Sequence, residues 1–360
     1  MSGLGRFTRL LAAAVALALL AAVAAGGGGA AAAKSRPGPV PAGFFGVVPD
    51  TPLAATDWVK MGTLGLSDRF QVVWAEVEPE PGHYEWSSVD SIVGEAAAHG
   101  VKLMPEVYGS PAWATPEPAL PPLGSGQRTA WTEFLQALVH RYGPGGEFWA
   151  GKAHPVPIRR WQIWNEPNYP LFWQPRPSPS GYIHLLQISK KAIQGVDPKA
   201  MIVAAGLAPI EHEPPPWKFL QEMYAVRGAR HAFEAAALHP YSNSMKGLAY
   251  SVGSVRRIMA QAGDGAKPLF VTELGVSSAG GSGFDLGPQG QAEFLRGALS
   301  RLAKERTRWH IGAVFWFTWD DTASASPGCP FCANAGLFGL NGEPKPAMAA
   351  LEKVVARWER

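Results

Sequence analysis

The sequence has little net charge and no pattern of metal ligands. Its 360 residues include 32 Lys and Arg and 29 Asp and Glu, which gives a formal net charge of +3. This balance provides no strongly basic surface, so neither nucleic acid nor an anionic membrane surface is an expected partner. His83, His99, His140 and His231 lack the spacing of metal ligands, and we expect no metal and no other cofactor.

Cysteine is scarce as well. Only Cys329 and Cys332 occur, in the stretch PGCPFCANAG. A zinc site would need further ligands, and none clusters near this pair. Redox chemistry would suit a cytosolic chain, whereas export favours a structural disulfide between Cys329 and Cys332. In the chain-entropy model so small a ring adds only about 2 kcal/mol, so the bond would fix a local loop and not the fold.

The first 33 residues have the order of a secretory leader. Arg6 and Arg9 precede the apolar stretch 10–25, and small residues fill 26–33. This order predicts a signal peptide over 1–33, a short linker over 34–41 and one domain over 42–360. An uncleaved membrane anchor is the alternative, because residues 10–33 could nearly span a bilayer. Cleavage would leave a monomer outside the cytoplasm with no stable membrane partner.

Eight short apolar runs alternate with stretches of helical periodicity. The predicted strands are 44–48, 69–74, 102–107, 160–164, 201–205, 235–239, 269–273 and 311–317, and the predicted helices are 56–61, 89–99, 129–141, 180–195, 217–227, 247–262, 289–306 and 346–357. Eight such pairs predict a single-domain (β/α)8 barrel. A doubly wound sheet is the alternative, but it would want a glycine-rich phosphate loop after its first strand, and GVVPDTPL is not one.

Proline and tryptophan are abundant, with 33 and 14 residues. Proline is dense after the third predicted strand, in GSPAWATPEPALPPLGSGQ, where it precludes regular structure and predicts a stiff loop. Loops that follow strands lie on the catalytic face of such barrels, so this one is expected to form a cleft wall. Tryptophan offers sugar rings a flat apolar face with one polar edge, although core packing explains scattered tryptophans equally well.

Two glutamates stand at the ends of predicted strands, Glu166 after the fourth and Glu273 after the seventh. Either one alone could be a salt bridge at the rim, but strands four and seven face each other across the mouth of an eight-stranded barrel. Nearby carboxylates in a cleft repel each other and split their pKa values, so that one holds a proton while the other stays ionised. Cleavage of a glycosidic bond needs that division of roles.

The motifs WNEP around Glu166 and VTELG around Glu273 resemble the strand-four and strand-seven motifs of the clan A glycoside hydrolases, a group of retaining (β/α)8 enzymes. With EVEPEPGHYEW, SPAWA, RYG, WQIWNEPN, LHPY and NGEPKPA in order, residues 43–350 are most similar to family 39 and related exopolysaccharide-type members. The resemblance implies that Glu166 is the general acid/base and Glu273 the nucleophile. It also implies that Asn165 binds the sugar 2-hydroxyl.

Further site residues follow from the same resemblance. Arg69, in an R-x4-W-x3-E-P arrangement, is similar to an arginine that keeps the nucleophile ionised, with a structural ion pair as the alternative. His239 and Tyr241, in LHPYS, resemble a pair whose tyrosine hydroxyl touches the nucleophile and whose histidine lines the site. Trp316 and Trp319, in VFWFTWDD, lie where the clan places a sugar-stacking tryptophan. Strand alternation puts these two on opposite faces, and we favour Trp316.

Two further residues lie near the predicted mouth. Glu106 ends the third strand and could bind hydroxyls or tune Glu166, although a salt bridge is the favoured alternative. Trp113 lies in the proline-rich loop and could form a platform for a sugar one subsite away.

The adjacency of Asn165 and Glu166 makes a geometric prediction. A regular strand would aim neighbouring side chains at opposite faces. If both reach the sugar, the strand must bulge or end there, and Pro167 stops further pairing. A regular strand through Glu166 would contradict this prediction.

The expected function is that of a secreted retaining glycoside hydrolase that cleaves a polysaccharide or oligosaccharide by double displacement, with carbohydrate as its partner. A transglycosylase would use the same two glutamates. A catalytically silent carbohydrate-binding protein would keep the tryptophans and lose a carboxylate, whereas both carboxylates are present here. The motifs fix neither the sugar and its linkage nor endo against exo action.

Overall fold

The computed structural model describes residues 38–211, 213–325 and 328–359. The predicted leader over 1–33 and the first residues of the predicted linker lie outside this range and stay predictions. A compact unit begins at Pro39. Val40 is buried in this unit, and its N–H donates to Trp358 O at 2.7 Å. The end of the predicted linker is therefore part of the folded unit. No helix in the described part of the chain is long and apolar enough to cross a membrane.

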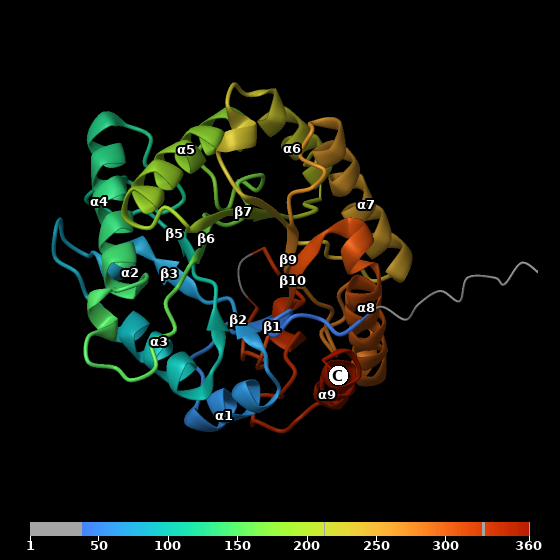
Figure 1. Ribbon diagram of the computed structural model, residues 1–360. Coiled ribbons are helices and arrows are strands. Elements are labelled where there is room, and N and C mark those ends of the chain that lie inside the picture. The colour runs from blue at the N-terminus through green and yellow to red at the C-terminus, as the bar shows by residue number, and fades with distance from the viewer. Residues whose placement is uncertain (1–37, 212, 326–327, 360) are drawn as a thin grey trace, which may run out of the picture. The chain divides into compact units, whose positions relative to one another are not determined.

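Parallel strands form a closed barrel at the centre of this unit (Figure 1). The strand segments are β1 (Phe45–Val48), β2 (Ser67–Asp68), β3 (Gln71–Val73), β4 (Lys102–Leu103), β5 (Glu106–Tyr108), β6 (Arg160–Ile163), β7 (Met201–Leu207), β8 (Ala235–Leu238), β9 (Leu269–Leu274) and β10 (Ile311–Phe317). Their order in the sheet is β3-β5-β6-β7-β8-β9-β10-β1-β2-β4. Because β2 and β3 are consecutive parts of one stretch, as are β4 and β5, the two ends of this order meet. The sheet therefore closes into the predicted (β/α)8 barrel, and the open doubly wound alternative is wrong.

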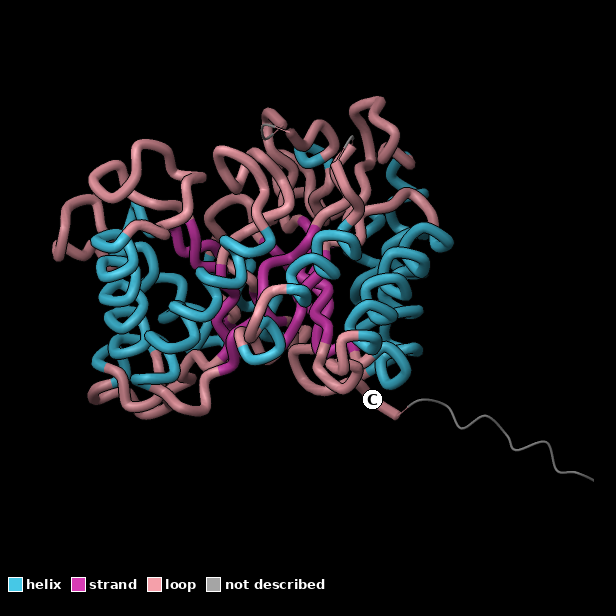
Figure 2. Tube along the Cα trace, turned by 90° about the horizontal axis from the view of Figure 1, so that it is seen from above, coloured by secondary structure: helices cyan, strands magenta, loops and turns pink. Residues whose placement is uncertain are grey.

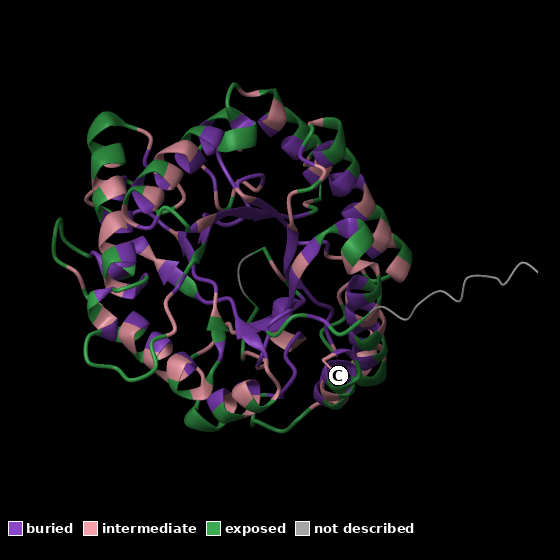
Figure 3. Ribbon diagram, viewed as in Figure 1, coloured by how far each residue is buried: buried purple, intermediate pink, exposed green. Residues whose placement is uncertain are grey.

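The helices surround the barrel on its outside (Figures 1 and 2). They are α1 (Ala55–Thr63), α2 (Trp74–Val77), α3 (Ser87–His99), α4 (Ser125–Tyr142), α5 (Pro179–Val196), α6 (Pro216–Ala225), α7 (Met245–Gln261), α8 (Gly287–Trp309) and α9 (Pro346–Trp358), with short 3-10 turns η1 (Glu147–Trp149), η2 (Ala229–His231) and η3 (Cys332–Asn334). In α4 the buried residues Trp131, Phe134, Leu135 and Leu138 recur at helical spacing and form one apolar stripe. Figure 3 shows such buried faces turned toward the strands.

The predicted strand 102–107 is interrupted, and the predicted strand 69–74 is shortened to β3 and preceded by a further segment, β2. Pro105, which has no N–H to donate, lies between β4 and β5. Arg69 and Phe70 lie between β2 and β3, yet the ladder continues across them, because Phe70 O accepts the N–H of Glu106 at 2.8 Å. Trp74, predicted to end the second strand, instead begins α2.

The core has two parts that lie on opposite sides of the strands. Alternate residues of neighbouring strands, among them Val203, Ala237, Phe270 and Phe315, form a smaller cluster inside the barrel. The intervening residues pack in a larger cluster with the helices. This alternation determines which side chains at the strand ends face the mouth.

Asp68 on β2 is a buried carboxyl group with one oxygen that lacks a hydrogen-bond partner among the described residues. It is 1% exposed, and the oxygen without a partner there is Oδ1. Burial raises the pKa of Asp68 from 3.8 to about 8, against the attraction of Arg69. Between these two values the folded state keeps a proton that the unfolded state releases, so this carboxyl lowers the free energy of unfolding as the pH rises.

We expect Asp68→Asn, which mimics the protonated carboxyl, to match the native protein near pH 4 and to exceed its free energy of unfolding by about 1–3 kcal/mol at pH 8. Urea unfolding at both pH values measures this difference. Glu222→Gln, at a half-exposed side chain on α6 that pairs with Lys218, is the control that should change either value by no more than about 0.5 kcal/mol. A difference of the same size at both pH values would contradict the account of Asp68.

Candidate active site

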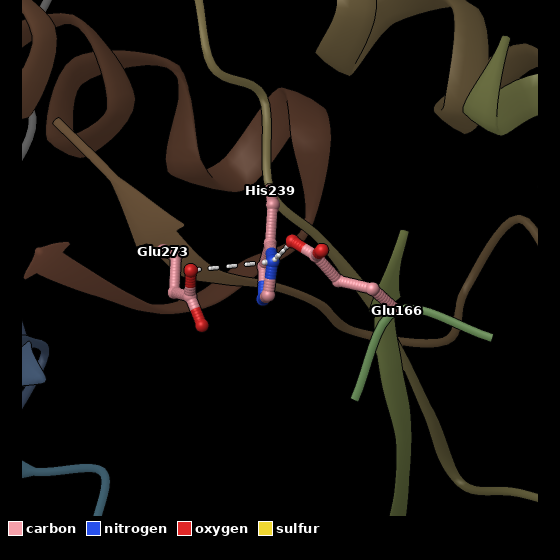
Figure 4. Close-up of side chains that lie close together, drawn as sticks. All are labelled: Glu166, His239 and Glu273. Atoms are coloured by element: carbon pink, nitrogen blue, oxygen red, sulfur yellow. Dashed lines mark hydrogen bonds and ion pairs between the residues drawn. The ribbon is translucent and has the colours of Figure 1, made fainter. Parts of the chain in front are cut away.

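Three side chains from the carboxyl ends of three strands meet at the mouth of the barrel (Figure 4). Glu166 follows β6, His239 follows β8 and Glu273 belongs to β9. His239 Nδ1 lies 2.7 Å from Glu166 Oε1 and 3.5 Å from Glu273 Oε2. A carboxylate oxygen of Glu166 lies within 4.8 Å of one of Glu273. The two glutamates predicted as a catalytic pair are thus brought together.

The strand that carries Glu166 ends before it, as the adjacency of Asn165 and Glu166 predicted. β6 stops at Ile163, and Trp164 and Glu166 have positive φ angles of 70° and 37°. Non-glycine residues rarely adopt this left-handed region, which costs about 1–3 kcal/mol at each position. The turn brings Asn165 Oδ1 to 3.5 Å from Arg69 Nη2 while Glu166 meets His239. Both side chains therefore reach the mouth, and that prediction is confirmed.

Arg69 links the carboxylates of Glu273 and Glu106. Its Nη1 donates to Glu273 Oε1 at 2.8 Å, its Nη2 donates to Glu106 Oε1, and its Nε donates to Gln162 Oε1 at 2.7 Å. The side chain is fully buried. Burial alone would lower the pKa of Arg69, but Glu106 and Glu273 raise it, so the guanidinium keeps its charge.

Tyr241 provides a second donor to Glu273. Its hydroxyl donates to Glu273 Oε2 at 2.6 Å. Burial and the neighbouring charge of Glu273 raise the pKa of Tyr241 well above its ordinary value, so the hydroxyl keeps its hydrogen. Each oxygen of Glu273 thus accepts one hydrogen bond, and the carboxylate is held in one orientation.

Glu166 and His239 form a hydrogen bond between His239 Nδ1 and Glu166 Oε1. Burial raises the pKa of Glu166, and burial lowers the pKa of His239 to about 4. The neutral ring either donates from Nδ1 to the Glu166 carboxylate or accepts there from a protonated Glu166. The ring lies so close to Gly206 on β7 that a Cβ at that position would lie 1.9 Å from His239 Nε2. Glycine at 206 is therefore needed for this placement of His239.

The same three residues also have the spacing of metal ligands, since one donor atom from each lies within 4.8 Å of the others. A divalent cation would have to enter beside the positive Arg69 guanidinium, which lies 2.8 Å from Glu273. The donor atoms of Glu166 and Glu273 already engage His239, Arg69 and Tyr241. These contacts fit two carboxyl groups that are each hydrogen-bonded to neighbouring side chains better than they fit a metal centre.

Arg69 contacts Glu273, as the resemblance implied, while His239 contacts Glu166 and Glu106 contacts Arg69. Arg69, His239 and Glu106 are at most 1% exposed. Glu106 forms the salt bridge that was the favoured alternative for it, and burial raises the pKa of Glu106 to about 8. Arg69 and His239 hold the two glutamates directly and Glu106 holds Arg69, and these three side chains have almost no exposed surface.

The predicted sugar platform at Trp316 is wrong. Trp316 and Trp319 are both fully buried, and the Trp316 indole N–H donates to Ala335 O at 3.1 Å. Trp316 lies on the face of β10 that packs against the helices, whereas Phe317 belongs to the cluster inside the barrel. Trp316 and Trp319 were predicted to lie on opposite faces, but both belong to the cluster that packs with the helices, because β10 ends at Phe317 and regular alternation does not extend to Trp319.

Trp113 is partly buried in the proline-rich loop, where its indole N–H donates to Glu78 O at 2.9 Å. Its ring packs edge-on against Trp74, with centroids 5.5 Å apart. Nothing in these contacts places a sugar on it, and its role as a platform stays a prediction.

Cys329 and Cys332 form the predicted disulfide, with Cα atoms 5.4 Å apart.

Two residues of the site were missed in the sequence. Gln162 orients Arg69, and its signal was a polar residue inside the otherwise apolar strand RWQI. Phe331 packs on Tyr241, with ring centroids 5.2 Å apart, and nothing local in CPFC indicated that contact.

Comparisons with known proteins show the same fold. No protein-family model matches the chain, and no curated protein sequence is significantly similar to it. Among solved structures, a family 39 glycoside hydrolase from Bacteroides cellulosilyticus WH2 is 21% identical, with a TM-score of 0.65 over 87% of this chain and 63% of the other. A monomeric β-xylosidase from Caulobacter crescentus CB15 is 19% identical, with a TM-score of 0.67 over 89% of this chain and 69% of the other.

An exo-β-1,4-mannosidase from Opitutaceae bacterium strain TAV5 is 15% identical, with a TM-score of 0.61 over 88% of this chain and 59% of the other. This chain spans less than two thirds of the length of the family 39 enzyme and of the mannosidase. Nearly all of the chain therefore has the barrel fold of these glycoside hydrolases.

Proposed function

We propose that this protein is a retaining glycoside hydrolase in which Glu273 is the nucleophile and Glu166 the general acid/base. The observation that carries the proposal is the pair of buried carboxyl groups with oxygens within 4.8 Å of each other. Retaining enzymes hold their two carboxyl groups about 5–5.5 Å apart, whereas inverting enzymes leave about 6.5–9.5 Å for a water molecule. The fold shared with glycoside hydrolases supports the same assignment.

The partners of Glu273 suit a nucleophile. Arg69 places a positive charge beside its carboxylate, and Tyr241 donates to the other oxygen. Charge-assisted hydrogen bonds of this kind orient a carboxylate without a proton on it. An oxygen lone pair of Glu273 can therefore be aimed at the anomeric carbon.

The partners of Glu166 suit an acid that later acts as a base. Among the described residues no lysine or arginine forms an ion pair with Glu166, and burial raises its pKa. A raised pKa keeps a proton available near neutral pH. The neutral His239 ring can stabilise either protonation state of Glu166 through Nδ1.

The reaction then has two balanced steps. Glu273 attacks the anomeric carbon, the glycosidic C–O bond breaks with its electron pair moving to the leaving oxygen, and that oxygen takes the proton of Glu166. In the second step Glu166 removes a proton from water while the water oxygen attacks the anomeric carbon and displaces Glu273. Two inversions at one carbon give net retention.

Neutral β-glycosides are the proposed substrate class. The nitrogens of Arg69 are engaged by Glu106, Glu273 and Gln162, which leaves this cation poorly placed to grip an acidic sugar. The net charge of +3 gives little attraction for a polyanion. The names of the β-xylosidase and β-1,4-mannosidase of similar fold also support β-linked neutral sugars. The predicted leader and the disulfide support a location outside the cytoplasm.

Azide can separate the two roles. We expect Glu273→Ala and Glu166→Ala each to lower the hydrolysis of glycans roughly 10³-fold or more. With 4-nitrophenyl β-glycosides and sodium azide, Glu273→Ala should give the α-glycosyl azide, because a single displacement inverts the carbon. Glu166→Ala should give the β-glycosyl azide, because the glycosyl-enzyme still forms with this leaving group and azide replaces water. Proton NMR of the products distinguishes the two anomers.

Glu222→Ala, remote on α6, serves as the control that should leave hydrolysis unchanged. Exchanged azide products would reverse the assignment of the two glutamates. Equal activity of the native protein and Glu273→Ala on a panel of aryl glycosides would end the proposal.

Tyr241→Phe tests the hydrogen bond that orients Glu273. Loss of a hydrogen bond to a charged group costs about 1.5–3 kcal/mol, so kcat/KM should fall about 10- to 150-fold. Tyr250→Phe, at an exposed position on α7, should have native kinetics. Native kinetics for Tyr241→Phe would show that the hydroxyl does not support the nucleophile.

A further inference from the structure

The disulfide-closed segment 329–332 places an aromatic ring against the tyrosine that holds the nucleophile. Phe331 lies inside this segment and is 7% exposed. Its ring meets Tyr241 at a centroid distance of 5.2 Å and an interplanar angle of 67°. It also stacks on Phe284 at 4.8 Å. Phe331 is therefore wedged between Tyr241 and the loop that follows β9.

Tyr241 needs such support because it lies in the loop after β8. Its hydroxyl must stay within hydrogen-bond distance of Glu273 Oε2, which it meets at 2.6 Å. His239 and Phe331 are the two rings that contact it among the described residues. The contact with His239 is an edge approach at 6.1 Å, so Phe331 makes the closer one. Without Phe331 the Tyr241 side chain could turn away from the carboxylate.

The segment that carries Phe331 is held by hydrogen bonds on one side and by close packing on the other. On one side η3 begins at Cys332 and ends at Asn334, whose carbonyl oxygen accepts from Ser278 N at 2.9 Å and Lys345 Nζ at 3.1 Å. On the other side Gly328 packs so closely against Tyr169 that a Cβ there would lie 2.4 Å from the tyrosine Oη. The disulfide closes the ring between these contacts and limits the positions that Phe331 can take.

We propose that Phe331 is a positioning residue that, held by the Cys329–Cys332 disulfide, keeps the Tyr241 hydroxyl on Glu273. This inference rests on the proposed function of Glu273. It gives the disulfide a role in catalysis that its small ring would not otherwise have. Phe331 acts through Tyr241 and takes no part in bond making or breaking.

A double-mutant cycle tests this inference. Phe331→Ala should lower kcat/KM for an aryl β-glycoside about 3- to 30-fold in the native background, mostly through kcat, because residues in contact are energetically coupled. In a Tyr241→Phe background, where no hydroxyl remains to be positioned, the same change should cost less than about twofold. An equal loss in both backgrounds would overturn the inference, since a direct sugar contact or a general loss of structure does not depend on the Tyr241 hydroxyl.

Phe294→Ala is the matched control. Phe294 on α8 is also 7% exposed, but it packs with the helices, away from Tyr241. It should lower Tm as Phe331→Ala does and leave kcat/KM within about twofold of the native value. If Phe331→Ala fails to fold, Phe331→Leu keeps apolar volume. It should lower kcat/KM by a smaller factor, and that loss should likewise nearly vanish in the Tyr241→Phe background.

Reduction supplies an independent test of the disulfide. Dithiothreitol, and separately the Cys329→Ser and Cys332→Ser double variant, should lower kcat/KM in the native background and have little effect in Phe331→Ala. An effect of the same size in both would contradict the link between the disulfide and Phe331. Failure of the proposed function is distinguishable, because it would appear as equal activity of the native protein and Glu273→Ala, whereas failure of this inference leaves Glu273→Ala inactive.

Discussion

The ion-paired guanidinium of Arg69 is the interaction on which the site depends. A fully buried charge is costly unless it is paired and hydrogen-bonded, and Arg69 meets that condition with Glu273, Glu106 and Gln162. These partners come from β9, β5 and β6, so one side chain links the stretch between β2 and β3 to the nearby strands β5 and β6 and to the more distant β9. These bonds fix the orientation of Glu273. Arg69 Nη2 also lies 3.5 Å from Asn165 Oδ1, in the turn that presents Glu166.

This network includes groups whose environment is unfavourable: two buried carboxyl groups and two residues with strained backbone angles. Glu106 and Glu166 are both pushed toward their protonated forms by burial, and Trp164 and Glu166 adopt left-handed backbone angles. Such strain persists only where the surrounding structure enforces it. Here the Trp164 N–H continues the ladder to Val107 O at 2.8 Å, and its indole N–H donates to Phe172 O at 2.6 Å. The packed barrel thus supports a strained turn that places Asn165 and Glu166 together.

Much of this architecture could be predicted from periodicity. The eighth strand was predicted with its observed bounds, 311–317, and the helix 346–357 ends one residue short of α9. Pro105 was a local signal that the strand 102–107 is interrupted, whereas nothing local placed β2 before Arg69. Trp316 was misplaced because tryptophan suits both a sugar platform and a core, and only the assembled barrel shows which face of β10 meets the helices. Phe331 was missed because its contact with Tyr241 spans 90 residues of sequence and depends on how two loops fold.

The central claim is that Glu273, held by Arg69 and Tyr241, forms a covalent bond to the sugar. Incubation with a 2-deoxy-2-fluoro β-glycoside that bears a good leaving group slows the second step and should trap the glycosyl-enzyme. Peptide mass mapping should then find one added sugar on the peptide that contains Glu273, and none in Glu273→Ala. A sugar attached to another residue, or turnover with no trapped intermediate and an inverted product, would contradict the account.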